Sequence, residues 1–420
     1  MFTVTEELKG LVIDYDSFEN ISVDEIRSLN NEIKCVIITS KFENKEYFDR
    51  ELKGIKILYL NASEKNLSPN IHTHTKILDI INLKTTEIGY FSSDYFFLKR
   101  AYIFLSTTIW ISDIVDYDST KALPDIIIDD IASFIKILKG NSLGFFGENY
   151  IFSSEKRLGT VTQTSFNVGN EKIPIYIAGR YFGSNHYMKE LHPYSRAISL
   201  NKREKSRCKN KFNIKFKEIF FGIIDIISKN NIIYGVLSVP VKPSKQNRFL
   251  ELLDYICQKC NLKNLSSEFL CIENYSDQKE LNSEEREKNI KGVFKYNGNL
   301  KGKTIILIDD IITTGATLRE CIKVLKDAEA KEIIIVILAI NQIESYYYTL
   351  NIPEVICPVC RGIMKLNANG GNKKFFYSCI TCYKNKGKSK TIGFSYALKK
   401  VLEKENEELK KARENEDFSF

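Results

Sequence analysis

The chain has 420 residues, of which 43% are hydrophobic and 12% aromatic; this is enough for a large core and predicts two or three domains rather than one. No run of eighteen apolar residues occurs, and MFTVTEELKG lacks the regions of a signal peptide, so we expect a cytoplasmic protein without a membrane partner. The net charge of +8 is compatible with a phosphate-rich ligand or nucleic acid, although a solvated lysine-rich surface is the simpler explanation.

Strands and helices alternate through the first 140 residues. Apolar runs occur at 10–18, 35–40, 55–60, 87–94, 107–112 and 124–138, with a helical pattern at 75–83. This alternation is typical of a parallel sheet covered on both faces. The ligand site of such sheets lies beyond the carboxyl ends of the strands, where we find Asp14, Asp16, Thr39 and Asp94. We therefore expect these four side chains to converge.

The order of these residues resembles the pattern of haloacid dehalogenase-like (HAD) hydrolases. That pattern is a D-x-D after the first strand, a Thr or Ser after the second, a Lys at the start of a later helix and an acidic pair after the next strand. The resemblance covers about residues 8–140 and implies a HAD-like domain over 1–140. It implies that Asp14 is the nucleophile and Asp16 the general acid. It also implies that Thr39 contacts the phosphate, that Lys76 balances its charge and that Asp94 is a Mg²⁺ ligand.

Two positions depart from the HAD pattern. Phe18 stands where the family usually has Thr or Val, and Tyr90 stands where the first aspartate of a G-D-x-x-x-D motif is expected. One metal ligand is then missing, so the domain is either a phosphatase or a degenerate fold used for structure or binding. Residues 141–214 are expected to connect the domains, and IPIYIAGRYFGSNHYMKELHPYSRAISLNKR within them fits a substrate pocket, a β-rich insertion or an interdomain surface.

A strand, a loop, a helix and a second strand are predicted over residues 302–339. Asp309 and Asp310 end the first strand, and the hydroxyl-rich turn 313–317 precedes the helix. Backbone N–H groups at a helix start can bind a phosphate, and Gly315 lets the backbone approach it closely. The two adjacent acids repel each other unless they accept sugar hydroxyls or act around Mg²⁺. A ribose 5-phosphate supplies both the hydroxyls and the phosphate.

The segment TIILIDDIITTGAT resembles the 5-phosphoribosyl-1-pyrophosphate (PRPP) signature of type I phosphoribosyltransferases, D-D-x-x-T-T-G-x-T after an apolar run. The resemblance implies a PRPP-binding domain over 215–345 that displaces pyrophosphate from C1 of the ribose by a nitrogen nucleophile, with Mg²⁺ on the pyrophosphate. Asp309 and Asp310 would bind the ribose hydroxyls. The 5-phosphate would lie against Thr313, Thr314, Gly315, Ala316 and Thr317.

Neighbouring residues resemble ComF-like phosphoribosyltransferases, whose Q-x-x-L-x-x-x-x-R-x-x-N pattern is matched by Gln278, Leu281, Arg286 and Asn289. Val239 and Pro240 resemble the pyrophosphate-loop strand of that family. The resemblance implies that Arg286 and cations of the 242–248 loop neutralise the pyrophosphate; the candidates in that loop are Lys242, Lys245 and Arg248. The chain departs from the family at an R-G-F-N-Q segment, for which it offers only KQNRFLELL.

Four cysteines are spaced as C-x2-C-x18-C-x2-C: Cys357, Cys360, Cys379 and Cys382. This spacing predicts a zinc ribbon over 346–390, with disulfides or an iron–sulfur cluster as alternatives. A ribbon of this kind is either a structural module or binds nucleic acid. The second interpretation depends on interleaved cations and aromatics, namely Arg361, Lys365, Lys373, Lys374, Phe375, Phe376 and Tyr377. Cys257 and Cys260 also have metal spacing, but we interpret them as packed or exposed thiols.

The last segment, 391–420, predicts a charged helix. The sequence therefore predicts an α/β protein with two Rossmann-like parallel-sheet domains, a zinc ribbon and a terminal helix, and we expect a homo-oligomer. Two function classes remain open. One is a Mg²⁺-dependent phosphoribosyltransferase fused to a HAD-like phosphatase, and the other is a non-catalytic PRPP or nucleotide sensor that binds nucleic acid, in competence, stress response or phage defence.

Overall fold

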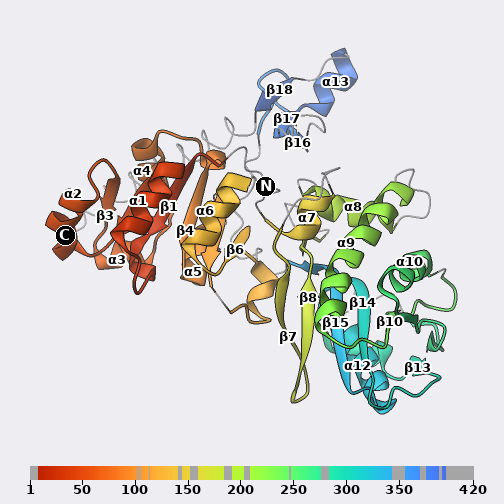
Figure 1. Cartoon of the computed structure of the whole chain (residues 1–420). Coiled ribbons are helices and arrows are strands. Elements are labelled where there is room, and N and C mark those ends of the chain that lie inside the picture. Colours follow the sequence, from red (N-terminus) through yellow and green to blue (C-terminus); the bar gives the residue numbers. More distant parts are fainter. Residues whose placement is uncertain are drawn as a thin grey trace.

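The computed structural model describes residues 8–101, 104, 106–112, 114–140, 144–151, 159–183, 192–202, 209–245, 247–275, 283–342, 355–368, 375–386 and 390–393. These ranges form two α/β units, each built on its own sheet, and a small cysteine-bearing module (Figure 1). The first unit lies at the left of Figure 1, the second at the right and the module above them. Among the described residues, no helix is both long and apolar enough to cross a membrane.

The first unit is a six-stranded sheet in the order β3-β2-β1-β4-β5-β6, with every neighbouring pair parallel. Its strands are β1 (Gly10–Asp14), β2 (Lys34–Thr39), β3 (Lys56–Tyr59), β4 (Ile88–Ser92), β5 (Thr107–Ile111) and β6 (Ile126–Ile128). Its helices are α1 (Val23–Glu32), α2 (Lys45–Glu51), α3 (Ala62–Asn66), α4 (Ile71–Ile81), α5 (Tyr95–Ala101) and α6 (Ile131–Gly140). β1 and β4 are buried along their whole length, which is why their sequences are mostly apolar runs rather than alternating patterns.

The winding of the first sheet changes direction between β1 and β4. The chain passes from β1 to β2 and β3 on one side, and then from β4 to β5 and β6 on the other. In such sheets the ligand crevice lies beyond the strand ends at this change of direction. Asp14 is the last residue of β1, and Ser92 is the last residue of β4. The predicted acidic edge therefore lies at the position where this topology favours a ligand.

The second unit is a mixed sheet in the order β11-β10-β14-β15-β8-β7, with β9 also paired to β15. Its strands are β7 (Thr162–Val168), β8 (Glu171–Ile177), β9 (Arg180–Tyr181), β10 (Gly235–Ser238), β11 (Lys263–Asn264), β14 (Thr304–Ile312) and β15 (Glu332–Asn341). Among the described strands of this sheet, β7 alone runs antiparallel to its neighbour. The predicted α/β fold with two Rossmann-like sheets is confirmed, and the second sheet is mixed rather than purely parallel.

Strands β7 to β9 come from residues 162–181, within the region that we expected to connect the domains. This segment extends the second sheet beyond β15, which agrees with the β-rich insertion that the sequence left open. The alternating pattern of EKIPIYI explains the pairing, because Ile173, Ile175 and Ile177 reach the core while the residues between them do not.

Helices cover both faces of the second sheet. They are α7 (Phe146–Tyr150), α8 (Pro193–Asn201), α9 (Lys209–Asn230), α10 (Leu250–Cys260), α11 (Ser283–Ile290) and α12 (Ala316–Asp327), and a hairpin of β12 (Phe269–Cys271) and β13 (Phe294–Tyr296) lies outside the sheet. Ile306 and Ile308 of β14 belong to the core cluster of α8, α9 and α10, whereas Ile305 and Leu307 belong to that of α12. Successive side chains of β14 thus face opposite sides of the sheet.

Buried polar contacts join the two units. Arg180 of β9 is 1% exposed and donates through Nη1 to Asp125 of the first unit at 2.8 Å. Its Nε and Nη2 donate to the two carboxylate oxygens of Glu148 in α7, each at 2.9 Å. Gln342, which follows β15, adds two hydrogen bonds to the backbone of the first unit. The stretch around Arg180 is therefore an interdomain surface, one of the interpretations that its sequence left open.

The cysteine-bearing module consists of three antiparallel strands and one helix. These are β16 (Lys365–Ala368), β17 (Phe375–Ser378), β18 (Thr391–Gly393) and α13 (Ile380–Lys386). Because β18 pairs with β17, residues 391–393 form a strand and the helix that we predicted over 391–420 does not begin at residue 391. Residues 394–420 lie outside the described residues.

Candidate functional site

Asp309 and Asp310 lie within β14, which continues beyond them to Ile312. Asp309 is opposite Ile337 of β15, and the parallel ladder resumes at Ile311. Because neighbouring residues of an extended strand project to opposite faces, the two carboxylates lie on different sides of the sheet. The repulsion that we expected between adjacent acids is therefore avoided by the continuous strand, without any ligand.

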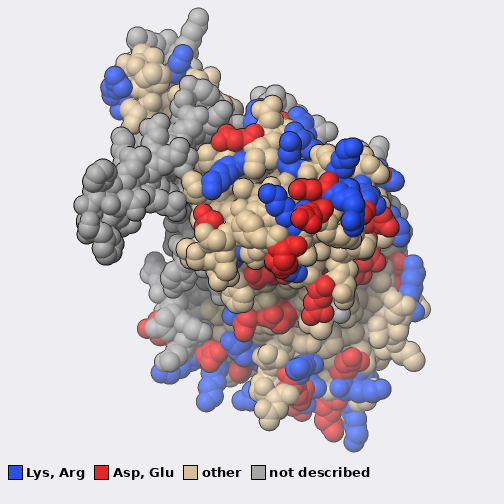
Figure 2. Space-filling model, turned by 90° about the vertical axis from the view of Figure 1, so that its left-hand side faces the viewer, with Lys and Arg blue, Asp and Glu red and all other residues tan. Residues whose placement is uncertain are grey.

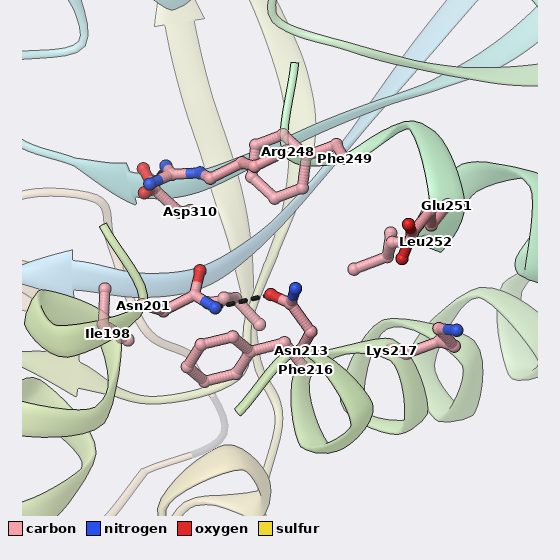
Figure 3. A pocket seen from close by; sticks show the side chains of 11 residues that line it. Ile198, Asn201, Asn213, Phe216, Lys217, Arg248, Phe249, Glu251, Leu252 and Asp310 are labelled. Atoms are coloured by element: carbon pink, nitrogen blue, oxygen red, sulfur yellow. Dashed lines mark hydrogen bonds and ion pairs between the residues drawn. The ribbon is translucent and has the colours of Figure 1, made fainter. Parts of the chain in front are cut away.

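Asp310 contacts two cations on the side of the sheet that carries α8, α9 and α10. Lys202, directly after α8, places its Nζ 2.9 Å from Asp310 Oδ2, and Arg248 donates through Nη2 to the same oxygen. The side chain of Asp310 is 9% exposed, against 40% for Lys202 and 24% for Arg248. The other carboxylate oxygen of Asp310 accepts the backbone N–H of Ile311 at 2.7 Å. In Figure 3 the guanidinium of Arg248 reaches Asp310 at the edge of the pocket.

Burial raises the pKa of Asp309 to about 6, although nearby Lys202 and Arg248 act in the opposite direction. Desolvation and repulsion from Arg248 lower the pKa of Lys202 to about 8, even though part of its side chain reaches solvent. The pKa of Asp309 and the pKa of Lys202 are therefore both closer to 7 than the ordinary values for these groups. Groups with such shifts are common where charged ligands bind, and also in structural ion pairs.

The loop after β14 is built around Gly315, which has φ +79° and precedes the first residue of α12, Ala316. A Cβ on Gly315 would lie 2.6 Å from the ring of Phe166 in β7, so both the left-handed backbone and the close approach require glycine. Thr313 is exposed, and Thr314 and Thr317 are half-buried. This arrangement leaves hydroxyls and helix-start N–H groups next to one another, as phosphate binding requires.

The predicted basic residues are distributed around β14. Lys242 lies over the ring of Tyr275, with its Nζ 4.6 Å from the ring centroid. Arg286 belongs to α11, and its side chain is outside the described residues, as are Gln278 and Leu281. Lys202 belongs to the stretch 173–203, for which a substrate pocket was one of the interpretations, but it was not singled out there as a site residue.

A small pocket lies beside Asp310, between α8, α9 and the start of α10 (Figure 3). Its cavity of about 20 Å³ is large enough for one water molecule. Phe216 and Phe249 contribute aromatic walls, and Asn201 donates through Nδ2 to Asn213 Oδ1 at 2.5 Å across it.

At the edge of the first sheet, Asp14 is 1% exposed. Its Oδ1 lies 2.6 Å from Nζ of Lys65 in α3, and its Oδ2 accepts the hydroxyl hydrogen of Ser92 at 2.9 Å. Burial raises the pKa of Asp14, and the Lys65 ammonium partly offsets the increase. The lysine partner is thus Lys65, whereas Lys76 lies on α4 and forms no ion pair among the described residues. The N-x-x-E capping box that begins α3 was the available sequence signal for a helix at Lys65.

The second acid of the first sheet, Asp16, is held by the last residue of β2 and by the residue after it. Thr39 donates through Oγ1 to Asp16 Oδ1 at 2.5 Å, and Ser40 donates through both its backbone N–H and its hydroxyl to Oδ2 at 2.7 Å. Asp94 Oδ1 accepts the N–H of Phe96 at 2.8 Å, at the start of α5. Tyr90 is fully buried and hydrogen-bonded to the ring of a histidine in α4, so it faces the core rather than the acidic edge.

The four cysteine thiols of the third module form a group in which all sulfur atoms lie within 4.8 Å of one another. Cys357 Sγ is 3.7 Å from Cys382 Sγ, and Cys360 Sγ is 3.3 Å from Cys379 Sγ. Tetrahedral zinc with Zn–S bonds of about 2.3 Å places its sulfurs about 3.8 Å apart, so the group could hold zinc. Among the described residues, no other group of three or more His, Cys, Asp or Glu side chains is placed to bind a metal ion.

The structure describes some of the residues that we expected to bind nucleic acid. Arg361 is exposed, but Tyr377 is 2% exposed and packs in the core, so it cannot stack on a base. The side chains of Lys365, Lys373, Lys374 and Phe375 lie outside the described residues. On the face drawn in Figure 2, Lys and Arg are interspersed with Asp and Glu among the described residues.

A family model described as "Phosphoribosyl transferase domain" matches residues 263–353. The match contains β14, the Gly315 loop and α12. It does not contain α8, Lys202 or Arg248. It supports a type I phosphoribosyltransferase domain in this part of the chain. A search of curated proteins found no match.

Proposed function

We propose that the protein is a Mg²⁺-dependent phosphoribosyltransferase that binds PRPP at the carboxyl end of β14. The observation that carries this proposal is the continuous β14–Gly315–α12 unit, which lies inside the matched segment. It brings two acids and a hydroxyl-rich helix start to one edge of the sheet, and PRPP has ribose hydroxyls for the first and a 5-phosphate for the second.

The residues of this unit would position the ribose. The turn from Thr313 to Thr317 binds the 5-phosphate through hydroxyls and N–H groups, and Asp310 accepts a ribose hydroxyl on its face of the sheet. A nitrogen atom of the acceptor then forms a bond to C1 while the C1–O bond breaks, and pyrophosphate leaves with the electron pair. The acids and the phosphate oxygens of PRPP are oxygen donors of the kind that Mg²⁺ prefers, and the ion would neutralise charge on the leaving group when bound.

A titration tests the proposal directly. PRPP is added to the protein with Mg²⁺, binding is followed by calorimetry, and pyrophosphate release is measured across a panel of nitrogenous bases. We expect saturable binding and release with at least one base, with both lost in Asp310→Asn. Binding without release for any base would favour the sensor class, and failure of the wild type to bind PRPP would overturn the proposal.

A second candidate activity is phosphate-ester hydrolysis at the first sheet. The ion pair between buried Asp14 and Lys65, beside an Asp16 held by Thr39 and Ser40, supports it. Asp14 would attack phosphorus and Asp16 would protonate the leaving group. Hydrolysis of p-nitrophenyl phosphate that is abolished by Asp14→Asn is expected; a wild type without hydrolysis would reduce this unit to a scaffold.

We also propose that the four cysteines bind one zinc ion, which stabilises the third module. Their sulfur separations and thiol chemistry suit Zn²⁺. Elemental analysis should find about one zinc per chain in the wild type and a loss of zinc in Cys357→Ser, with Cys260→Ser as the control. A wild type free of zinc would contradict the assignment.

A further inference from the structure

We propose that Lys202 is a ligand-binding residue of the phosphoribosyl site and that it binds the pyrophosphate group of PRPP together with Arg248. The inference rests on the proposed function, because it names a further contact to the same ligand. Lys202 follows the last residue of α8, outside the segment that matches the family model. The contact would therefore be a feature of this chain's own α8 and not of the matched segment.

The first argument is the crowding of charge at one atom. Lys202 Nζ and Arg248 Nη2 both bind Asp310 Oδ2, so the two cations lie close together and repel each other. A single carboxylate oxygen cannot accept hydrogen bonds from all the N–H donors of both cations, because each cation has several. A pyrophosphate group has several anionic oxygens and would give each cation its own acceptor.

The second argument is access. Lys202 is 40% exposed and Arg248 is 24% exposed, whereas Asp310 is 9% exposed. An anion arriving from solvent therefore meets the two cations before it meets the carboxylate. Arg248 also closes the 242–248 loop that follows β10, the segment in which we expected the pyrophosphate contacts. Arg248 lines the pocket beside Asp310 (Figure 3), and Lys202 reaches the same carboxylate from the residue after α8.

The third argument links the cations to the ribose. In the proposed site Asp310 accepts a ribose hydroxyl, but its Oδ2 is already shared by Lys202 and Arg248. Movement of both cations to the pyrophosphate would free this oxygen at the moment when the ribose arrives. Binding of the pyrophosphate and binding of the ribose hydroxyl are thus coupled through Asp310.

Calorimetry with three Mg²⁺-containing probes tests the inference: PRPP, inorganic pyrophosphate and ribose 5-phosphate. We expect Lys202→Ala to weaken binding of PRPP and pyrophosphate by about 10- to 100-fold, the usual effect of losing a hydrogen bond to a charged group. Binding of ribose 5-phosphate should change by less than about twofold. The matched control is Lys217→Ala, since Lys217 lines the same pocket but lies over the ring of Tyr255; it should bind all three probes as the wild type does.

The conservative variant gives a second readout that a purely structural lysine would not produce. Lys202→Arg keeps a cation next to Arg248 and should retain the binding of pyrophosphate that Lys202→Ala loses.

The outcomes separate the two proposals. A wild type that binds neither PRPP nor ribose 5-phosphate removes the proposed function, and this inference with it. A wild type that binds PRPP, with Lys202→Ala binding it equally well, overturns the inference alone. Equal weakening of PRPP and ribose 5-phosphate in Lys202→Ala would also overturn it, because the residue would then act through the shape of the site.

Discussion

In each of the two sheets, a central parallel strand carries at or near its carboxyl end a carboxylate that pairs with a lysine from another element, but the settings differ. Asp14 is sealed from solvent, with one lysine on one oxygen and one hydroxyl on the other. Asp310 shares one oxygen between two cations that reach solvent. A sealed carboxylate with a partner on each oxygen favours a fixed arrangement, whereas an oxygen shared by two cations suits an exchange of partners when an anion binds.

The spacing of the acids produces this difference. Asp14 and Asp16 are separated by one residue, and the 3₁₀ turn Tyr15–Ser17 after β1 brings Asp16 to Thr39 at the end of β2. Asp309 and Asp310 are adjacent on one continuous strand, so they face opposite sides of the sheet. Two similar sequence patterns thus produce one joint acidic edge in the first sheet and two separated acids in the second.

The largest effect is expected from Gly315→Ala. The new Cβ would lie 2.6 Å from the Phe166 ring on a backbone with φ +79°, so we expect a loss of about 3 kcal/mol in unfolding free energy and of at least about 100-fold in PRPP affinity. Gly302→Ala is the matched control, since Gly302 has φ +71° and open space around it, and it should cost only about 1 kcal/mol. Unfolding free energies are measured by urea denaturation. An equal loss of unfolding free energy in both variants would contradict the close approach of Gly315 to the ring of Phe166. Hydrolysis at the first sheet should be unchanged.

Lys65→Met should have the next largest effect. It leaves the buried Asp14 carboxylate without its cation, which we expect to cost about 3 kcal/mol at pH 7. Because burial already raises the pKa of Asp14, protonation at lower pH should recover part of the loss. Lys76→Met is the comparison, with an expected change below about 0.5 kcal/mol. If Lys76→Met were the more destabilising variant in chemical denaturation, the assignment of Lys65 would be wrong.

Asp309→Asn tests the electrostatics of the second sheet. The pKa of Asp309 is raised from 3.8 to about 6 in the folded protein, so the folded state retains a proton that the unfolded state has lost. Its contribution to stability is therefore greatest below about pH 4 and decreases as the pH rises to about 6, by up to about 3 kcal/mol. We expect Asp309→Asn to match the wild type at pH 4 and to exceed it in unfolding free energy at pH 7. Asp129→Asn, at an exposed position, is the control.

The smallest effect is expected from Ser92→Ala. The variant removes the hydroxyl that donates to Asp14 Oδ2 and should cost about 1–2 kcal/mol. Ser63→Ala, which removes an exposed hydroxyl–amide contact, is the control and should be neutral within about 0.5 kcal/mol. A neutral Ser92→Ala in thermal unfolding would show that Asp14 does not depend on this donor.

Local patterns predicted the parts of the molecule whose geometry is local. The apolar run, the single glycine and the following helical periodicity specified β14, the loop and α12, because a left-handed residue between a strand and a helix leaves few alternatives. The spacing of Cys357, Cys360, Cys379 and Cys382 likewise predicted that the four thiols lie close together, because each C-x2-C pair is a local turn. The pairing of β8 and β9 with β15 was not predicted, because the paired residues lie more than 150 positions apart in the chain, whereas β7 pairs locally with β8.

The amino-acid sequence by itself determined which elements form and which carboxylates and thiols they carry, since these depend on periodicity, capping and spacing within short segments. Only the tertiary structure decided the partners of those carboxylates. Lys65 and Lys202 reach Asp14 and Asp310 from helices that follow other strands, and nothing in their local sequence separates them from the other lysines on the surface. The physical reason is that an ion pair depends on distance in space, which the order of strands in each sheet sets.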